Sequence, residues 1–428
     1  MRQTLLYIPI NWIIIAWAIA CVVAVFWLYR KHGWGKEVIG FLPFAAISGA
    51  IIIFGLPYLQ DSEINPADPE GPRIVGLPIR GYGFFLLLAT LAGVGTATYR
   101  AKSLGKDPDV ILSLAFWVFI VGIVGARMFY VLQKFDEFNI HNPTEFFFAM
   151  ISMTKGGLVI YGGLIGALLA FVAFMAKNRL PMFEFADIIA PSMILGLSIG
   201  RLGCLMNGCC FGGVCTIEPL AVQFPEGSPP YLRELETGEL LGIHGKPGKS
   251  QQLDELGMTT VESVDAGSVA DQHGIKPGDR IGITFDSEQL QLARYNVARN
   301  VVIQINRTSS NPIMIDYDEL PKQSLKIHPT QVYSSIDAGL IFLFLWFFFP
   351  FRQRNGQVFA LLMIIYPVAR TIEEFIRIDE PGQFGTIFTI SQWVSLFIFV
   401  LGLGLYVYVM LRKSEPPIGE MSAHAQAA

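Results

Sequence analysis

Long apolar runs separated by short polar and charged segments make up most of this chain. Nine of these runs have roughly the 17–25 residues that a helix needs to cross a bilayer. They lie at about 9–29, 37–59, 82–99, 109–133, 157–176, 185–205, 335–350, 357–376 and 391–411. The pattern predicts an all-α integral membrane protein with about nine transmembrane helices and a polar segment between the sixth and the seventh.

Basic residues gather in alternate loops of this arrangement. They are Arg30, Lys31, Lys36, Arg100, Lys102, Lys106, Lys177, Arg179, Arg352, Arg354, Arg412 and Lys413. The positive-inside rule therefore predicts an external N-terminus and a cytoplasmic C-terminus. The first apolar run is too long for the core of a cleavable signal peptide, so we expect it to remain as a span.

Composition agrees with this topology. Hydrophobic residues make up 52% of the chain and charged residues 15%, and the mean hydropathy is +0.48. These values exclude an ordinary soluble enzyme. The net charge of −4 and the lack of a basic patch give no sign of a nucleic-acid partner.

The polar segment 213–327 is expected outside the membrane as a small mixed β region. Within it, about 256–320 resembles a PDZ domain. The resemblance rests on Gly267-Ser268-Val269-Ala270 and on Gly274-Ile275-Lys276-Pro277-Gly278-Asp279-Arg280-Ile281. It implies binding of an extended peptide or protein ligand by strand addition. A small β-domain that only covers the site is the alternative.

Several polar residues share one expected depth in the outer leaflet. They are Arg127, Arg201, Arg370, Glu374, Tyr82 and Tyr161, with His328 just before the seventh span. Ionisable residues at membrane depth mark functional sites by default, although each arginine could instead be a structural pin. Arg370 and Glu374 can pair at i,i+4. The remaining surplus of guanidinium predicts an anionic ligand, such as a phospholipid phosphate.

The segment 200–212 combines Arg201, Asn207, Gly208 and Gly212 with three cysteines, and Cys215 follows. The expected external position permits a disulfide or inert packing. A catalytic or redox thiol is a second interpretation. Zinc is a third, but the spacing lacks the paired C-x₂-C pattern of structural zinc sites. We therefore expect no metal and no cofactor.

Residues 80–212 and 325–412 resemble the prolipoprotein diacylglyceryl transferase family of bacterial membrane enzymes. The shared motifs are Arg80-Gly81-Tyr82-Gly83, Gly125-Ala126-Arg127, Gly156 through Gly163, Gly200 through Gly212, His328-Pro329-Thr330-Gln331-Val332-Tyr333 and Arg370 through Phe375. The resemblance divides the chain into an N-terminal part with two extra helices (1–80), a first core part (81–212), an external segment (213–327), a second core part (328–412) and a disordered cytoplasmic tail (413–428).

The resemblance implies transfer of the diacylglyceryl group of phosphatidylglycerol to the lipobox cysteine of a preprolipoprotein, in the bacterial inner membrane. It implies catalytic roles for Tyr161, Arg201, Arg370, Glu374 and His328. The residues implied to bind phosphatidylglycerol are Arg127, Arg201, Arg370, Tyr82, Asn207, Gly208 and Gly212.

This chain departs from the family pattern at three positions. Tyr161 stands where many members have a histidine, and Cys204 and Cys209 replace an asparagine and a glutamate. At neutral pH a tyrosine hydroxyl is a donor rather than a base. Glu374, His328 or the lipid phosphate could accept the proton instead.

Three other functions stay open. A catalytically altered homologue would bind lipid or lipoprotein without transferring anything. A paralogue would modify another thiol acceptor. An intramembrane protease with a PDZ domain is disfavoured, because neither H-E-x-x-H nor G-x-S-x-G occurs in the chain.

Overall fold

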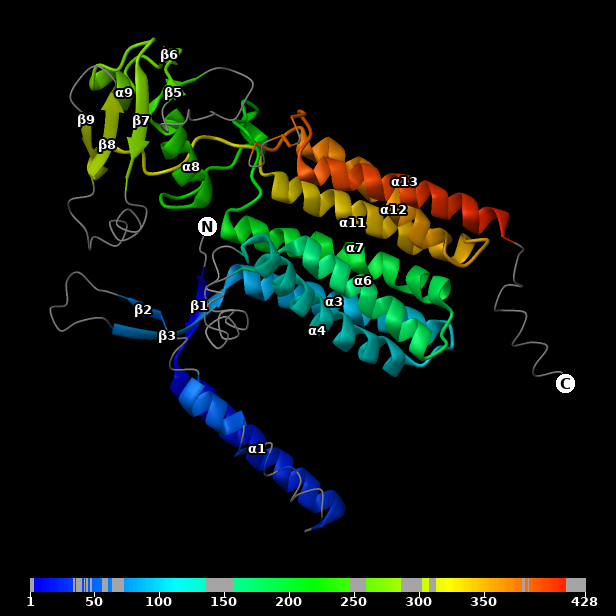
Figure 1. The fold of residues 1–428 in the computed structure, drawn as a ribbon. Helices are drawn as coiled ribbons and strands as arrows, with labels where there is room; N and C mark the ends of the chain where they lie inside the picture. Colours follow the sequence, from blue (N-terminus) through cyan, green and yellow to red (C-terminus); the bar gives the residue numbers. More distant parts are fainter. Residues whose placement is uncertain are drawn as a thin grey trace. The chain divides into compact units, whose positions relative to one another are not determined.

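Apolar helices account for most of the structure, which is a computed structural model (Figure 1). It describes residues 4–33, 35, 41, 43, 45–46, 48–55, 61–63, 73–135, 157–245, 259–285, 302–307, 313–378, 382–383 and 385–412. Within these residues, seven helices are long and apolar enough to cross a membrane. They are α1 (Ile10–His32), α3 (Gly81–Ser103), α4 (Pro108–Gln133), α6 (Ile160–Lys177), α7 (Met182–Asn207), α11 (Thr330–Phe348) and α13 (Ile390–Leu411).

These seven helices confirm seven of the nine predicted runs. The run at 357–376 also forms a helix, α12 (Gln357–Glu374), but Pro367 lies inside it and the charged residues Arg370, Glu373 and Glu374 lie near its end. It is therefore not among the seven apolar helices. The run at 37–59 lies partly outside the described residues; its described part includes the short π-helix η1 (Ile51–Gly55). The tail 413–428 also lies outside them.

The chain divides into two units. The first contains residues 1–86, 201–333 and 375–387, and the second contains 87–200, 334–374 and 388–428. In the second unit α4 lies beside α6, and α12 lies beside α13 (Figure 1).

Glycines bring α4 and α6 into close contact. A Cβ atom on Gly125 would lie 2.5 Å from the carbonyl oxygen of Gly162, and one on Gly166 would lie 2.5 Å from the carbonyl oxygen of Val121. Small residues at such a crossing allow two helix backbones to pack directly in an apolar environment. Gly162 of the Gly156–Gly163 motif lies at this crossing, whereas Gly156 lies outside the described residues.

Side-chain caps define where helices of the second unit begin. Asp107 caps α4, with its carboxylate accepting from the Asp109 backbone amide at 2.9 Å. Buried Asp187 accepts from the backbone amides of Gly356 at 2.8 Å and Phe359 at 2.9 Å, and so ties α7 to the start of α12. Because the first amides of a helix have no partner within it, these carboxylates satisfy them.

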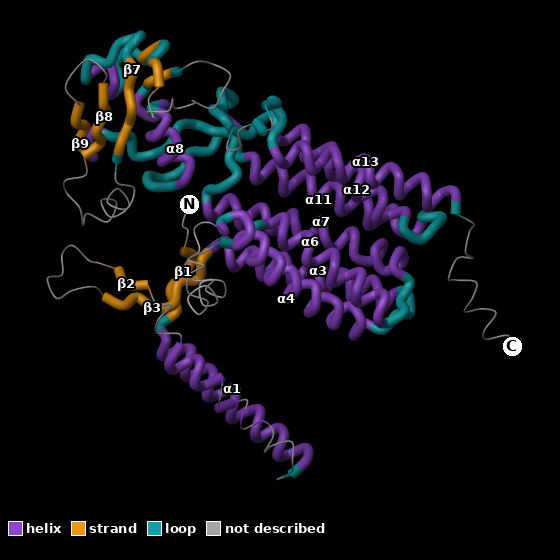
Figure 2. The backbone as a smooth tube through the Cα atoms, viewed as in Figure 1, coloured by secondary structure: helices purple, strands orange, loops and turns teal. Residues whose placement is uncertain are grey.

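The first unit is rich in β-structure (Figure 2). β1 (Thr4–Ile8) pairs with β3 (Arg73–Arg80), which also pairs with β2 (Asp61–Glu63). β4 (Ile243–His244) pairs with β6 (Ser263–Val264). A four-stranded antiparallel sheet has the order β5 (Thr259–Thr260), β7 (Arg280–Thr284), β8 (Val302–Arg307) and β9 (Ile313–Asp316).

The predicted small β region therefore exists. Its core joins α8 (Pro229–Thr237) to the four-stranded sheet through Tyr231, Leu235, Ile281, Ile305 and Ile315, none of which has exposed surface. The short helix α9 (Val269–Gln272) is capped by Ser268, as the small residues before it suggest.

Buried Glu234 makes the stability of this core depend on pH. Its carboxylate accepts from the Leu325 backbone amide at 2.8 Å, but burial raises its pKa from 4.5 to about 7. Because the folded state favours the protonated carboxyl, Glu234 contributes to the free energy of unfolding in full below pH 4.5. That contribution is lost as the pH rises through about 7.

We expect thermal unfolding of the full chain in detergent to show a loss of about 2 kcal/mol between pH 4.5 and pH 8 from this group. Glu234→Gln should remove that component. Exposed Glu236 lies on the same helix, so Glu236→Gln is the matched control and should behave like the native chain. An unchanged pH profile in Glu234→Gln would contradict the assignment.

Candidate functional site

The end of α7 shapes the first group of candidate residues. Gly208 has a φ of +75°, in the left-handed region that glycine tolerates. Its amide bonds to the Leu205 carbonyl at 3.3 Å, and the Cys209 amide bonds to the Cys204 carbonyl at 3.2 Å. This pair of bonds is a Schellman cap. It turns the chain back over the helix end and places Cys209 and Cys210 beside Cys204.

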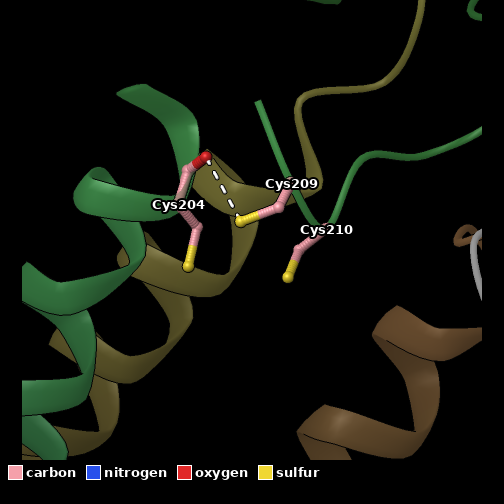
Figure 3. Close-up of side chains that lie close together, drawn as sticks. All are labelled: Cys204, Cys209 and Cys210. Atoms are coloured by element: carbon pink, nitrogen blue, oxygen red, sulfur yellow. Dashed lines mark hydrogen bonds between the residues drawn. The ribbon is translucent and has the colours of Figure 1, made fainter. Parts of the chain in front are cut away.

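Three thiols meet at this cap (Figure 3). The sulfur atoms of Cys204, Cys209 and Cys210 all lie within 4.8 Å of one another. Each residue is half-buried. The described cysteines are free thiols, so the disulfide considered from the sequence is not formed among them. Because thiolates are ligands for soft metals, the cluster is also the candidate metal-binding group of this site.

Cys210 is the thiol most easily ionised. Hydrogen bonds from the Cys204 and Cys209 thiols, together with the charges of Arg377 and Arg201, lower the pKa of Cys210 to about 2. Its backbone φ of +60° is uncommon for a residue with a side chain. Strained backbone of this kind persists where neighbouring contacts hold it, and it often accompanies function.

The start of α11 provides those contacts. Thr330 Oγ1 donates to the Cys210 carbonyl at 2.6 Å, and Gln331 Nε2 donates to the Cys209 carbonyl at 2.6 Å. Both side chains are buried. Both residues belong to the shared motif His328 through Tyr333, but no local pattern predicts a role for either of them. Their position directly after His328-Pro329 and before an apolar helix was the available signal.

Gly212 and His328 join the same loop to its neighbours. The Gly212 amide donates to the His328 carbonyl at 3.0 Å, and a Cβ on Gly212 would lie 2.8 Å from the His328 Cβ. Gly212 also forms a β-bridge with Arg377. The His328 Nδ1 lies 3.2 Å from the Tyr333 hydroxyl. Gly212 is thus required for close backbone approach, and His328 is oriented by Tyr333.

Arg201, Tyr82 and Asn207 surround the thiols. Arg201 precedes Cys204 by three residues on α7, so the two share a helix face. Tyr82, in the first turn of α3, contacts Gly203, whose Cβ would lie 3.3 Å from the tyrosine ring. Asn207 ends α7 two residues before Cys209, and its side chain acts electrostatically on that thiol.

Arg370 and Glu374 form the centre of the second group of candidates. The Arg370 Nη1 lies 2.6 Å from the Glu374 Oε2, which confirms the predicted i,i+4 pair. The opposite carboxylate oxygen accepts from the Thr389 hydroxyl at 2.9 Å. Glu373 accepts from the Ser334 hydroxyl. Glu374 is buried, and its carboxylate is held by both Arg370 and Thr389.

Arg127 and Tyr161 belong to the second unit as well. The buried Arg127 donates from Nη1 to the Gly157 carbonyl at 3.0 Å, and its guanidinium lies 5.1 Å from the centre of the Tyr130 ring. Tyr161 is half-buried in the first turn of α6, which begins at Ile160. Arg127 therefore fixes the segment that leads into Tyr161.

Comparison with known proteins gives a consistent result. The family model described as prolipoprotein diacylglyceryl transferase matches residues 72–408. A phosphatidylglycerol–prolipoprotein diacylglyceryl transferase of Rhodopirellula baltica is 36% identical, over 94% of this chain and 88% of its own length. A protein of the same name from Clostridium tetani is 25% identical, over 80% of this chain and 97% of its own.

Proposed function

The chain belongs to the prolipoprotein diacylglyceryl transferase family, and from this we propose that it transfers a diacylglyceryl group from phosphatidylglycerol to a preprolipoprotein cysteine. The family match over residues 72–408 carries the proposal. The cap and loop that follow Arg201 support it, because they place the Arg201 guanidinium close to three thiols and the loop contacts His328.

The reaction needs two kinds of assistance. The acceptor sulfur attacks the glyceryl carbon of the lipid, a C–S bond forms, and the C–O bond to the phosphate breaks. Glycerol phosphate leaves with the electron pair of that bond. A positive group on the phosphate stabilises the developing charge, and a thiolate is the reactive form of the acceptor.

We assign the phosphate-stabilising role to Arg201, with Arg370 and Arg127 as further phospholipid-binding residues. Tyr82 and Asn207 would orient the lipid headgroup. Gly208 permits the reversal of the chain through its positive φ, and Gly212 permits the close approach of the loop to His328 and Thr330.

A base must accept the proton of the acceptor thiol. His328 is the candidate base beside the loop that follows α7, and the Tyr333 hydroxyl lies 3.2 Å from its Nδ1. Glu374 has two donors on its carboxylate, so its candidate role is mainly to hold Arg370. Tyr161 is a candidate hydrogen-bond donor to the substrate.

The chain is a multi-pass membrane protein with at least the seven apolar helices described above. We further propose nine spans, including α12 and the run 37–59, with an external N-terminus and a cytoplasmic C-terminus. The alternating basic loops support this orientation. Labelling of single cysteines from one side of intact cells would test it; protection of the N-terminus from an external reagent would reverse the assignment.

We also propose that the external β region is a PDZ-like module that binds an extended peptide. Its antiparallel sheet, the capped α9 and the Gly274–Asp279 turn support this. Deletion of 256–320 should weaken the selection of protein substrates more than it weakens lipid binding. An unchanged substrate range would leave the module with a covering role.

Complementation tests the proposed function most directly. Expression of this chain in bacteria depleted of their own diacylglyceryl transferase should restore growth and the lipidated form of a reporter lipoprotein. Purified chain with phosphatidylglycerol should convert a labelled lipobox precursor to its thioether product. A reporter with serine at the lipobox cysteine is the control and should stay unmodified.

Failure of both assays with a correctly inserted chain would contradict transfer. Retention of lipid binding without conversion would instead support the altered homologue that binds lipid or lipoprotein.

A further inference from the structure

We propose that Cys204, Cys209 and Cys210 bind one zinc ion as a trithiolate site, and that the acceptor cysteine of the substrate is the fourth ligand. The first part stands on geometry alone. The second rests on the proposed transferase function. Both depart from the sequence-based expectation of no metal, which relied on spacing.

The arrangement of the three sulfurs supports the first part. Their mutual separations are at most 4.8 Å. Zinc–sulfur bonds of about 2.3 Å in a tetrahedron put ligand sulfurs roughly 3.8 Å apart. Side-chain rotations that move each sulfur by about one ångström or less would therefore bring the three sulfurs to the separations of a zinc site. The cap at Gly208 brings the three sulfurs together, although the i, i+5, i+6 spacing of the cysteines does not by itself suggest a metal site.

The rigidity of the loop also favours a metal site. Thr330 and Gln331 fix the carbonyls of Cys210 and Cys209 from buried positions. Ligand groups held in place by a surrounding shell of hydrogen bonds lose little freedom on binding a metal. This support is independent of the sulfur distances.

Two nearby arginines can compensate the negative charge of a zinc–thiolate complex at this site. Three thiolates and Zn²⁺ together carry a net charge of −1, and a fourth thiolate would make it −2. The guanidinium groups of Arg201 and Arg377 both act electrostatically on Cys210. They compensate this negative charge, whereas four uncompensated thiolates would be strongly disfavoured away from water.

The three protein ligands indicate a catalytic rather than a structural zinc site. Among the described residues, the group contains three ligand side chains and no fourth His, Cys, Asp or Glu. Catalytic zinc sites have three protein ligands and leave the fourth position to water or substrate, whereas structural sites have four. The cysteines are half-buried, so an incoming group can reach them.

An acceptor thiol on this zinc would lose its proton to water on coordination, because a coordinating thiol is deprotonated outright. Its sulfur would then attack the glyceryl carbon while the C–O bond to the phosphate breaks. Zinc stays divalent, so no oxidant or reductant is needed. Zinc would thus generate the reactive thiolate without a protein base.

The test uses the full chain, purified in detergent with its thiols reduced and dialysed against ZnCl₂. We expect one zinc per chain by elemental analysis. With CoCl₂ as the probe, we expect a sulfur-to-cobalt charge-transfer band. The triple variant Cys204→Ser/Cys209→Ser/Cys210→Ser should lose both. Cys21→Ser and Cys215→Ser are the matched controls and should keep both.

A second measurement, protection of the cysteines from alkylation in the native chain, tests the site even if the triple variant does not fold. Zinc should shield these three cysteines from alkylation, read by mass spectrometry, and a chelator should expose them. Equal alkylation with and without zinc, or full metal content in a folded triple variant, would overturn the site.

The fourth ligand is tested on the cobalt form. A lipobox peptide should shift its visible bands, and the same peptide with serine for cysteine should not; no shift with either peptide would overturn that ligand. A chain that lipidates precursors but binds no zinc refutes this site and leaves the proposed function intact. A chain that binds zinc through these thiols but transfers nothing refutes the function alone.

Discussion

Arg201→Ala should reduce lipid transfer by about a hundred-fold to a thousand-fold while leaving the fold intact. The magnitude is that of removing one preorganised group from a developing negative charge, about 3–4 kcal/mol of transition-state stabilisation. Because the charge develops on the phosphate as the C–O bond breaks, the loss should appear mainly in kcat. Arg201→Lys should recover part of the rate, since it keeps the charge but not the two-point geometry.

The measurement is a steady-state assay with phosphatidylglycerol as the varied substrate, alongside thermal unfolding. Lys102→Ala is a suitable control because Lys102 is exposed and lies in the last turn of α3. Full transfer by Arg201→Ala would exclude the phosphate role. A large fall in the unfolding temperature would instead indicate that Arg201 is a structural pin.

Hydropathy was sufficient to predict the helices because the membrane imposes their length. Seven of the nine predicted runs form long apolar helices among the described residues. The α12 segment shows the limit of the method. Its apolar positions predict a span, and the segment does form a helix, but Pro367 lies inside it and three charged residues lie near its end, so it is not among the seven apolar helices.

Local contacts that depend on sequence spacing were also predictable. The Arg370–Glu374 pair and the close packing of α4 and α6 at Gly162 follow from i,i+4 geometry and from small residues in an apolar helix.

The thiol cluster was not predictable from spacing. Cys204, Cys209 and Cys210 share no helix face, and their sulfurs meet only because the chain reverses at Gly208. Likewise, Thr330 and Gln331 contact residues about 120 positions earlier in the chain. Contacts of that range depend on tertiary structure, which no local pattern contains.

Separating Arg370 from Glu374 should cause the largest loss of stability expected of any single change discussed for this protein. Both side chains are buried, and their closest atoms are 2.6 Å apart. Glu374→Ala would leave the buried guanidinium with only the more distant Glu373 carboxylate, 3.9 Å away, and would remove a hydrogen bond to Thr389. Breaking a buried pair from one side costs about 3–5 kcal/mol.

The double variant Arg370→Met/Glu374→Leu separates stability from function. Replacing both partners with apolar residues of similar volume is often neutral, so we expect it to recover most of the lost stability. Transfer should nevertheless stay at least about a hundred-fold below native, because the guanidinium that we propose binds the phosphate is gone. Unfolding in detergent and the transfer assay report the two effects separately.

Glu218→Ala provides the control for ion-pair removal. The Glu218–Lys326 pair has nearly the same length, 2.7 Å, but Glu218 is exposed. Surface pairs contribute little, so this variant should match the native chain in both assays. If the double variant is stable and fully active, the pair serves only the fold, and phosphate stabilisation must come from Arg201 and Arg127. If it is stable and inactive, while Glu374→Ala loses activity only in proportion to unfolding, Arg370 acts on the lipid and Glu374 positions it.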